Sequence, residues 1–267
     1  MLRTRILTAA VLIPIAIGLI YLGGLPFLAL IGLLLSLAEI EFCRLMAQGN
    51  FRPALAFGLG TTWLLLLDAQ VPGPGFLRPG LALILLASLI WHMCHRRGTP
   101  VADWALTIVG GLYLGVCGAS MVRLRDLQDG RWWMLIVLCT VVCADTAAYF
   151  VGQAWGKHRM TPALSPGKTW EGYAGGLVVG GLTPVLSMLI WRAATGREIC
   201  VLHGLILGLL IGTLSPLGDL AISMIKRQAG AKDSGKIIPG HGGALDRLDS
   251  LLWAAILGYY YISWFVN

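Results

Sequence analysis

The sequence has little charge. Asp, Glu, Lys and Arg make up only 12% of its 267 residues, whereas 57% of the residues are hydrophobic. A soluble domain is about a quarter charged, so this composition excludes an ordinary soluble domain and predicts an integral membrane protein. The net charge of +7 does not indicate nucleic-acid binding, because the sequence offers no soluble basic face to carry it.

Several motifs are also missing. The six cysteines have no metal-ligand spacing, and we expect them to be small, buried apolar residues. The glycine-rich stretch 239–246 is not a Walker A loop, because no Gly-Lys-Ser/Thr follows four spacer residues there. The chain shows no internal repeat and no low-complexity tail.

Long apolar runs fill most of the chain. A transmembrane helix needs about 20 apolar residues, and the runs predict an all-α, polytopic membrane bundle of about nine such helices. The expected segments are roughly 6–22, 25–43, 54–71, 79–95, 101–121, 132–152, 173–192, 200–222 and 249–266.

The distribution of Lys and Arg predicts an orientation. Arg3 and Arg5 precede the first run, which could make it a signal peptide, but it lacks a small-x-small cleavage site and we expect a retained helix. With alternating helices, most cations fall on one side. The positive-inside rule then places the N-terminus and residues 223–249 in the cytoplasm and the C-terminus outside.

Polarity is unevenly distributed along the chain. Residues 1–130 read as transmembrane helices with short connections, whereas residues 131–267 are expected to carry a catalytic site that faces the cytoplasm. Glycines spaced by four recur within 172–180 and 204–212, a pattern that lets helices approach closely. Packing within one chain is the favoured interpretation, and a homodimer seam is the alternative.

Two of the carboxylates within the apolar runs lie in the C-terminal half of the chain, where the other polar residues gather. Asp145 and Asp219 are costly at membrane depth, so each should face a partner, water or an ion. A helix-to-helix ion pair is one interpretation, and a site open to the cytoplasm is the other, which we favour more strongly for Asp219. Pro216 is expected to disturb the helix and free carbonyl groups beside it. Helical spacing places four residues on one face, namely Ser215, Asp219, Ser223 and Lys226.

Two stretches have the composition of a phosphate site. Asp246 and Asp249 are three residues apart at the start of the last helix and, with Asp219, could hold Mg²⁺ through oxygen ligands. Alternatively, the two acids only stabilise a helix N-terminus. Upstream, residues 156–176 hold Lys168 among other cations and should start a helix near Trp170 or Gly172. That stretch is either a phosphate-binding loop or an ordinary positive-inside loop.

Together the two stretches are specific, because residues 223–249 resemble the signature of the phosphatidate cytidylyltransferases, also called CDP-diacylglycerol synthases. The matching residues are Ser223, Lys226, Arg227, Lys232, Asp233, His241, Gly242, Gly243, Asp246, Arg247 and Asp249. Upstream, LSPGKTWEG is similar to the family's Ser-Pro-Lys-Lys-Thr-Trp-Glu-Gly. The chain departs from the family at Gly167 and at Ala244, where a Lys and a larger aliphatic residue are usual.

The resemblance implies transfer of CMP from CTP to phosphatidate, giving CDP-diacylglycerol and pyrophosphate, in phospholipid biosynthesis at a bacterial inner membrane. It implies Mg²⁺ or another divalent cation, which we assign to Asp219, Asp246 and Asp249. The catalytic group would add Lys226, Arg227 and Arg247. Substrate binding is assigned to Ser165, Lys168, Thr169, Glu171, Ser223, Lys232, Asp233, His241, Gly242 and Gly243.

Two other functions stay open at this point. One is a different lipid phosphotransferase that uses CDP-diacylglycerol, although such enzymes carry Asp pairs with four-residue spacing. The other is a secondary transporter of an anionic solute, which broken helices and intramembrane acids would also fit. The lack of an internal repeat disfavours transport. Pyrophosphate release separates the cytidylyltransferase from a transporter, which gives none.

Overall fold

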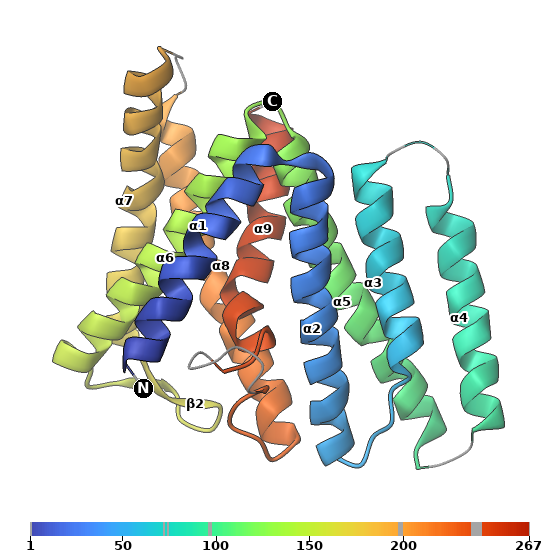
Figure 1. Ribbon diagram of the computed structural model, residues 1–267. Helices are drawn as coiled ribbons and strands as arrows, with labels where there is room; N and C mark the ends of the chain where they lie inside the picture. Colours follow the sequence, from blue (N-terminus) through green and yellow to red (C-terminus); the bar gives the residue numbers. More distant parts are fainter. Residues whose placement is uncertain are drawn as a thin grey trace. The chain divides into compact units, whose positions relative to one another are not determined.

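The computed structural model describes residues 2–71, 73, 75–95, 98–196, 200–235 and 242–266, with side chains from Ala10 onward. Within these ranges the chain forms nine α-helices and one β-hairpin, so the all-α prediction is confirmed apart from that hairpin (Figure 1). The elements are α1 (Leu2–Leu22), α2 (Gly24–Gln48), α3 (Leu55–Gln70), α4 (Leu77–Cys94), α5 (Pro100–Asp126), α6 (Gly130–Trp155), β1 (Arg159–Thr161), β2 (Ser165–Thr169), α7 (Trp170–Thr195), α8 (Val201–Gln228) and α9 (Leu245–Phe265).

Six of these helices are long and apolar enough to cross a membrane, namely α2, α4, α5, α6, α7 and α8. This bears out an integral membrane protein with several spans, while the count of nine spans stays a prediction. Two boundaries differ from those predicted. Helix α8 runs on to Gln228, and α9 begins at Leu245, so the acids predicted at its start lie inside its first turns.

The chain folds as two compact units. The first comprises Met1–Asp126 and Ile225–Leu248, and the second comprises Leu127–Met224 and Asp249–Asn267. The divisions fall inside α8 and inside α9, so each of these helices contributes to both units. The predicted division of the chain into residues 1–130 and 131–267 rests on where polar residues lie along the sequence, and it stays a prediction.

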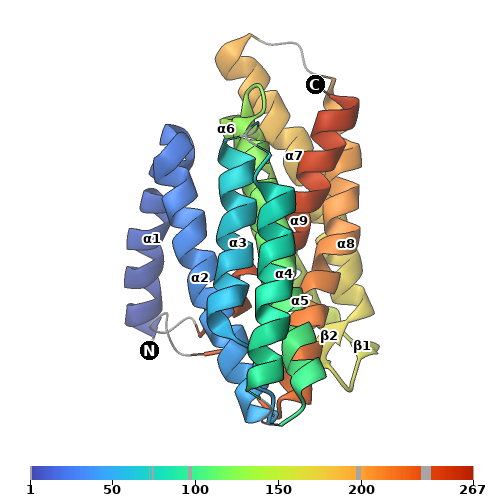
Figure 2. The same cartoon turned by 90° about the vertical axis from the view of Figure 1, so that its right-hand side faces the viewer.

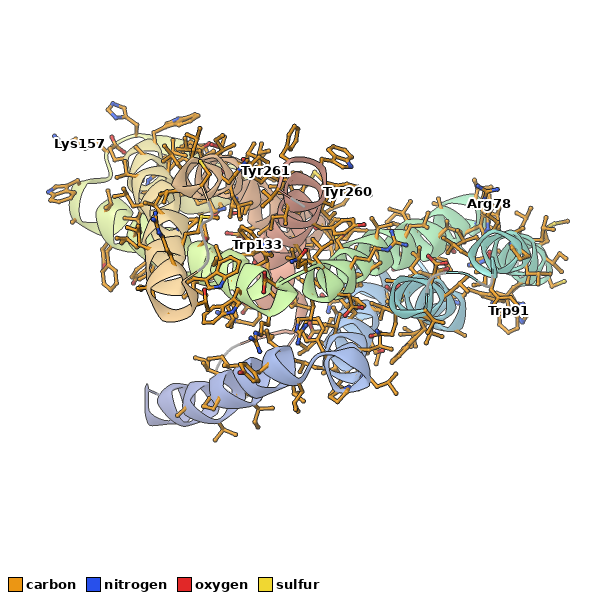
Figure 3. All side chains as sticks on the ribbon, turned by 90° about the horizontal axis from the view of Figure 1, so that it is seen from above. Arg78, Trp91, Trp133, Lys157, Tyr260 and Tyr261 are labelled. Atoms are coloured by element: carbon orange, nitrogen blue, oxygen red, sulfur yellow. The ribbon has the colours of Figure 1, made fainter. Side chains whose placement is uncertain are left out.

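In the first unit, α5 packs closely against α3 (Figure 2). A Cβ on Gly111 would lie 2.6 Å from the Gly58 carbonyl oxygen, so the two backbones are nearly in contact. Leu35, Leu66 and Leu114 fill the core beside them. Helix α4 is mostly exposed, and Trp91 projects outward from it (Figure 3).

In the second unit, the glycine stripe of α7 packs against α6. A Cβ on Gly172 would lie 2.6 Å from the Ala148 carbonyl oxygen, and one on Gly208 of α8 would overlap the Gly180 carbonyl oxygen. Both stripes are therefore used within one chain, as the favoured interpretation held. In the same unit, Trp133 of α6, which is labelled in Figure 3, packs edge-to-face on Trp191 of α7 with ring centroids 5.2 Å apart.

The prediction that the cysteines are buried is wrong for most of them. Only Cys117 is buried; Cys43 is half-buried, and the remaining four are exposed. The physical reason is that a membrane helix can carry apolar residues on its outer surface, because lipid rather than water surrounds that surface.

Candidate active site

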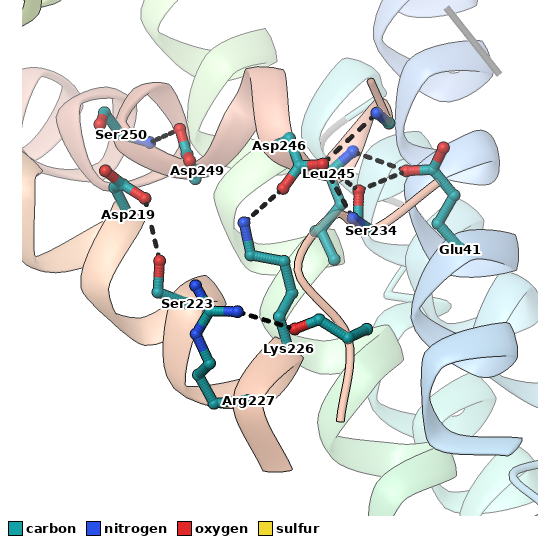
Figure 4. Close-up of polar contacts among 12 residues, drawn as sticks. Glu41, Asp219, Ser223, Lys226, Arg227, Ser234, Leu245, Asp246, Asp249 and Ser250 are labelled. Carbon is teal, nitrogen blue, oxygen red and sulfur yellow. Dashed lines mark hydrogen bonds and ion pairs between the residues drawn. The ribbon is translucent and has the colours of Figure 1, made fainter. Parts of the chain in front are cut away.

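The first unit holds a buried ion pair between α8 and the first turn of α9 (Figure 4). The Lys226 ammonium nitrogen lies 2.6 Å from Asp246 Oδ1, and each side chain is only 11% exposed. At this distance the contact is a charge-assisted hydrogen bond. The pair therefore fixes a cation at the end of α8, which is where the sequence predicted a phosphate contact.

The other oxygen of Asp246 is held by backbone and hydroxyl groups. Asp246 Oδ2 accepts from the Ser234 amide at 2.9 Å, from the Ser234 hydroxyl at 2.8 Å and from the Gly243 amide at 3.4 Å. Partial burial would raise the pKa of the Asp246 carboxyl, but the hydrogen bonds from Lys226 and Ser234 outweigh it, so the pKa is lowered. Asp246 is therefore ionised at neutral pH.

A second carboxylate, Glu41 of α2, completes this cluster. Glu41 is fully buried, and its Oε2 accepts from the Leu245 amide at 2.9 Å and contacts the Ser234 hydroxyl at 3.1 Å. The approach requires glycine, because a Cβ on Gly235 or Gly243 would overlap the Glu41 carboxylate. We call Glu41, Lys226, Ser234, Leu245 and Asp246 the first-unit cluster (Figure 4).

In the second unit, the β1–β2 hairpin leads directly into α7. Helix α7 begins at Trp170, as predicted, and the Thr169 hydroxyl caps it by accepting from the Gly172 amide at 3.1 Å. Thr169 is buried, whereas Ser165 is half-buried.

Glu171 accepts from the amides of Lys157 and His158 and pairs with the His158 ring at 2.7 Å, so it anchors the base of the hairpin.

Lys168, at the end of the hairpin, points to α8. Its ammonium nitrogen lies 2.9 Å from Asp219 Oδ2 and 3.0 Å from the Pro216 carbonyl oxygen. The Ser223 hydroxyl donates to Asp219 Oδ1 at 3.3 Å. Asp219 therefore does have an ion-pair partner, but that partner is Lys168 of β2, and one third of the Asp219 side chain stays exposed.

Helix α8 is continuous through Pro216, so the predicted interruption is wrong. Carbonyl groups near Pro216 are nevertheless used from outside the helix, since the Tyr173 hydroxyl donates to the Thr213 carbonyl at 3.0 Å and Lys168 donates to Pro216 itself. These donors bind carbonyl groups close to the proline, so other elements of the second unit hold this part of α8 in place.

Further carboxylates adjoin Lys168 in the second unit. Asp145 of α6 interacts electrostatically with Lys168 and Asp219 and accepts a hydrogen bond from the Ser250 hydroxyl of α9. A Cβ on Gly218 would overlap the Asp249 carbonyl oxygen, so α8 and α9 are in close contact beside Asp219. The second-unit cluster, as we call it, consists of Asp145, Lys168, Asp219, Asp249 and Ser250.

The remaining predicted site residues have simpler surroundings. Arg227 is exposed and donates to the Ala231 carbonyl at 3.2 Å. Gly242 has a positive φ of 83°, as a glycine tolerates. Lys232, Asp233 and Arg247 are exposed, and His241 lies outside the described residues.

The second-unit cluster has the right donors for a divalent cation, because Mg²⁺ prefers carboxylate and carbonyl oxygens. Within the described ranges, no three His, Cys, Asp or Glu side chains are gathered closely enough to hold a metal ion. Instead, the Lys168 ammonium supplies the positive charge beside Asp219 and Asp145. Asp246 belongs to the first unit, so its assignment to the same ion stays a prediction.

Comparison with known proteins decides the family. The model of the cytidylyltransferase family matches residues 3–265, nearly the whole chain. The chain belongs to the cytidylyltransferase family. Its relatives include proteins named phosphatidate cytidylyltransferase from Brucella suis, at 38% identity over 97% of this chain and 92% of that one, and from Pseudomonas aeruginosa, at 35% over 96% and 98%. One of the same name from Bacillus subtilis is 31% identical over 98% of both chains.

Membership makes the protein a nucleotidyltransferase. Among the charged members of the clusters in this cytidylyltransferase, Glu41 is the one that reasoning from the sequence missed. Glu41 lies in an apolar helix, far from both polar stretches, and contacts Leu245 across 204 residues of sequence. The only signal was an acidic residue within an apolar run, which applied equally to Glu39.

Proposed function

We propose that this protein transfers CMP from CTP to phosphatidate, forming CDP-diacylglycerol and pyrophosphate for phospholipid biosynthesis. The observation that carries the proposal is the near full-length similarity to proteins named phosphatidate cytidylyltransferase. Buried and partly buried cations beside carboxylates support it, since two anionic substrates must be brought together.

In the proposed reaction, a phosphate oxygen of phosphatidate attacks the α-phosphorus of CTP. A new P–O bond forms, the bond from the α-phosphorus to the bridging oxygen breaks, and pyrophosphate leaves with that electron pair. The attacking phosphate monoester is already ionised at neutral pH, so no strong general base is required. The task of the protein is to position the two anions and to stabilise the charge on the leaving group.

The residues divide this task. Lys226, with Arg227, Lys232 and Arg247, would hold phosphate groups, and the Lys226–Asp246 contact fixes one of these cations in place. Lys168 and Ser165 of the hairpin would contact CTP, with Thr169 and Glu171 shaping the same loop. A divalent cation held by Asp219 and Asp249, with Asp246 assigned from the sequence, would neutralise phosphate charge when bound.

The direct test is pyrophosphate release by the detergent-purified protein with CTP, phosphatidate and Mg²⁺, each omitted in turn. We expect release that requires all three. Release without phosphatidate, or with a different lipid acceptor only, would contradict the proposed acceptor. No release from a folded sample across several lipids and divalent ions would favour a phosphotransferase that uses CDP-diacylglycerol, or transport.

Replacement of Asp219 tests the site itself. Asp219→Asn should abolish turnover while the protein stays folded, because the amide removes the charge that Lys168 and the cation require. The matched control is Asp126→Asn, an exposed carboxylate that accepts from Gln70 at 3.2 Å, which should retain activity. Near-normal turnover of Asp219→Asn would contradict the metal assignment.

A further inference from the structure

The first-unit cluster contains a carboxylate that the proposed reaction does not use. The Glu41 side chain is completely buried, with an exposed fraction of 0%, although it lies in an apolar helix. Burying a carboxylate is costly unless hydrogen bonds compensate for lost hydration. Two groups near the cytidylyltransferase signature contact Glu41 Oε2. The Leu245 amide donates to it at 2.9 Å, and the Ser234 hydroxyl, which has one proton to share between Glu41 and Asp246, lies 3.1 Å away.

Ser234 links Glu41 to Asp246. Its hydroxyl lies 2.8 Å from Asp246 Oδ2 and 3.1 Å from Glu41 Oε2, so the same oxygen contacts both carboxylates (Figure 4). Asp246 in turn accepts from Lys226 through its other oxygen at 2.6 Å. A continuous chain of contacts therefore runs from Glu41 through Ser234 and Asp246 to the ammonium group of Lys226.

Glu41 also fixes the backbone on which this chain of contacts depends. Leu245 is the first residue of α9 and immediately precedes Asp246. The hydrogen bond from the Leu245 amide to Glu41 therefore holds the start of α9 against α2. Gly235 and Gly243 give the carboxylate room, because a side chain at either position would overlap it. Four residues therefore lie against this one side chain of α2, namely Ser234, Gly235, Gly243 and Leu245.

We infer that Glu41 is a positioning residue of the enzyme, which orients Asp246 and thereby Lys226 through Ser234 and the Leu245 amide. The inference rests on the proposed function, in which Lys226 holds a phosphate group. Glu41 itself touches no substrate. Its contribution is to hold Lys226 in the geometry needed when charge builds on the phosphates, since groups that orient an active side chain matter nearly as much as the side chain itself.

The test compares three substitutions of Glu41 by pyrophosphate release. Glu41→Ala should lower kcat by about 10- to 100-fold, because the loss of an orienting group has this magnitude. Glu41→Gln should restore most of the activity, because its amide oxygen can take the place of Oε2, the one oxygen that contacts both the Leu245 amide and the Ser234 hydroxyl. Glu41→Asp should stay impaired, because it is one methylene shorter.

Glu39 provides a matched control. It lies on the same helix, is equally buried and has carboxylate oxygens that contact no hydrogen-bond partner among the described residues. It packs beside Gly58, away from the first-unit cluster. Glu39→Ala should leave kcat unchanged for the folded fraction, which is measured for every variant by thermal unfolding in detergent.

A double-mutant cycle with Ser234→Ala separates positioning from simple destabilisation. Because Glu41 acts partly through Ser234 and partly through the Leu245 amide, the loss in the double variant should be clearly smaller than the product of the two single losses. A loss of kcat in the double variant that equals the product of the two single losses would overturn the inference. Failure of Glu41→Gln to restore activity, or full activity of Glu41→Ala, would overturn it as well. An inactive wild type would instead contradict the proposed function, so the two failures are distinguishable.

Discussion

At the scale of a single residue, Asp246 shows how its partners hold a buried carboxylate. Its carboxylate accepts from Lys226 on one oxygen and from Ser234 on the other, and it retains a negative charge although it is mostly buried. Breaking a buried pair by removing one partner typically costs about 3–5 kcal/mol, since the remaining charge is left uncompensated. The contact that stabilises Asp246 is therefore also the one that, in the proposed function, holds Lys226 in place for a phosphate group.

The lowered pKa of Asp246 predicts an acid-dependent contribution to stability. The folded state favours the ionised form, so the contribution is fully present above the ordinary pKa of about 3.9 and is lost as the pH falls through the lower, folded pKa. Asp246→Asn should be less stable than the wild type at pH 7, and the difference should shrink as the pH falls below about 4.

Thermal unfolding in one detergent across this pH range measures the effect. The Lys226→Met background is the control, because it removes the first of the hydrogen bonds that lower the pKa. There the pH dependence of the difference should be weaker. A difference between wild type and Asp246→Asn that grows towards low pH would contradict the sign of the pKa shift.

At the scale of elements, the hairpin and α7 depend on the cap at Thr169. Its hydroxyl accepts from the Gly172 amide at 3.1 Å. Thr169→Ala should lower the free energy of unfolding by about 1 kcal/mol, whereas Thr169→Ser should retain most of it, because serine is an equally good cap. Thermal unfolding of the two variants checks this. Equal losses for Ala and Ser would show that the methyl group, and not the cap, matters.

The crossing of α7 and α8 depends on the absence of side chains. A Cβ on Gly208 would overlap the Gly180 carbonyl oxygen and lie 2.9 Å from the Gly181 Cα. Gly208→Ala should therefore destabilise the second unit by about 1–3 kcal/mol, the usual cost of overpacking. The matched control is Gly18→Ala in α1, where a Cβ would meet nothing within 4 Å. Comparable stability of the two variants would contradict the close packing.

These elements show what the sequence could and could not predict. The start of α7 at Trp170 followed from local composition, and the two glycine stripes followed from helical spacing, since both depend on neighbours along the chain. Glu41 could not be found in this way, because its partner is 204 residues away. The interruption at Pro216 was predicted wrongly, because the local sequence does not show that Lys168 and Tyr173 of other elements bind α8 close to the proline.

At the scale of the whole molecule, the main prediction concerns orientation. Helix α7 has 26 residues, which corresponds to about 39 Å and exceeds the hydrocarbon core of about 30 Å. The hairpin before α7 and Cys200 after it should therefore lie on opposite sides of the membrane. With the N-terminus in the cytoplasm, the hairpin is cytoplasmic and Cys200 is outside.

Cysteine labelling in spheroplasts tests this orientation. With the other five cysteines replaced by Ala, a membrane-impermeant maleimide should label Cys200, which is exposed, without permeabilisation. In a second variant, Cys200→Ala with Gly167→Cys, labelling should appear only after permeabilisation. Gly167 suits the probe because a Cβ there meets nothing within 4 Å.

The result bears directly on function, because CTP is available only on the cytoplasmic side and Lys168 is adjacent to the labelled position in the hairpin. Labelling of Gly167→Cys from outside would place the proposed CTP contacts on the wrong side of the membrane, even if the protein released pyrophosphate in detergent. Labelling of both positions from one side would show that α7 does not cross the bilayer. Only opposite labelling, with the hairpin inside, is consistent with a nucleotide that arrives from the cytoplasm and a lipid that arrives from the membrane.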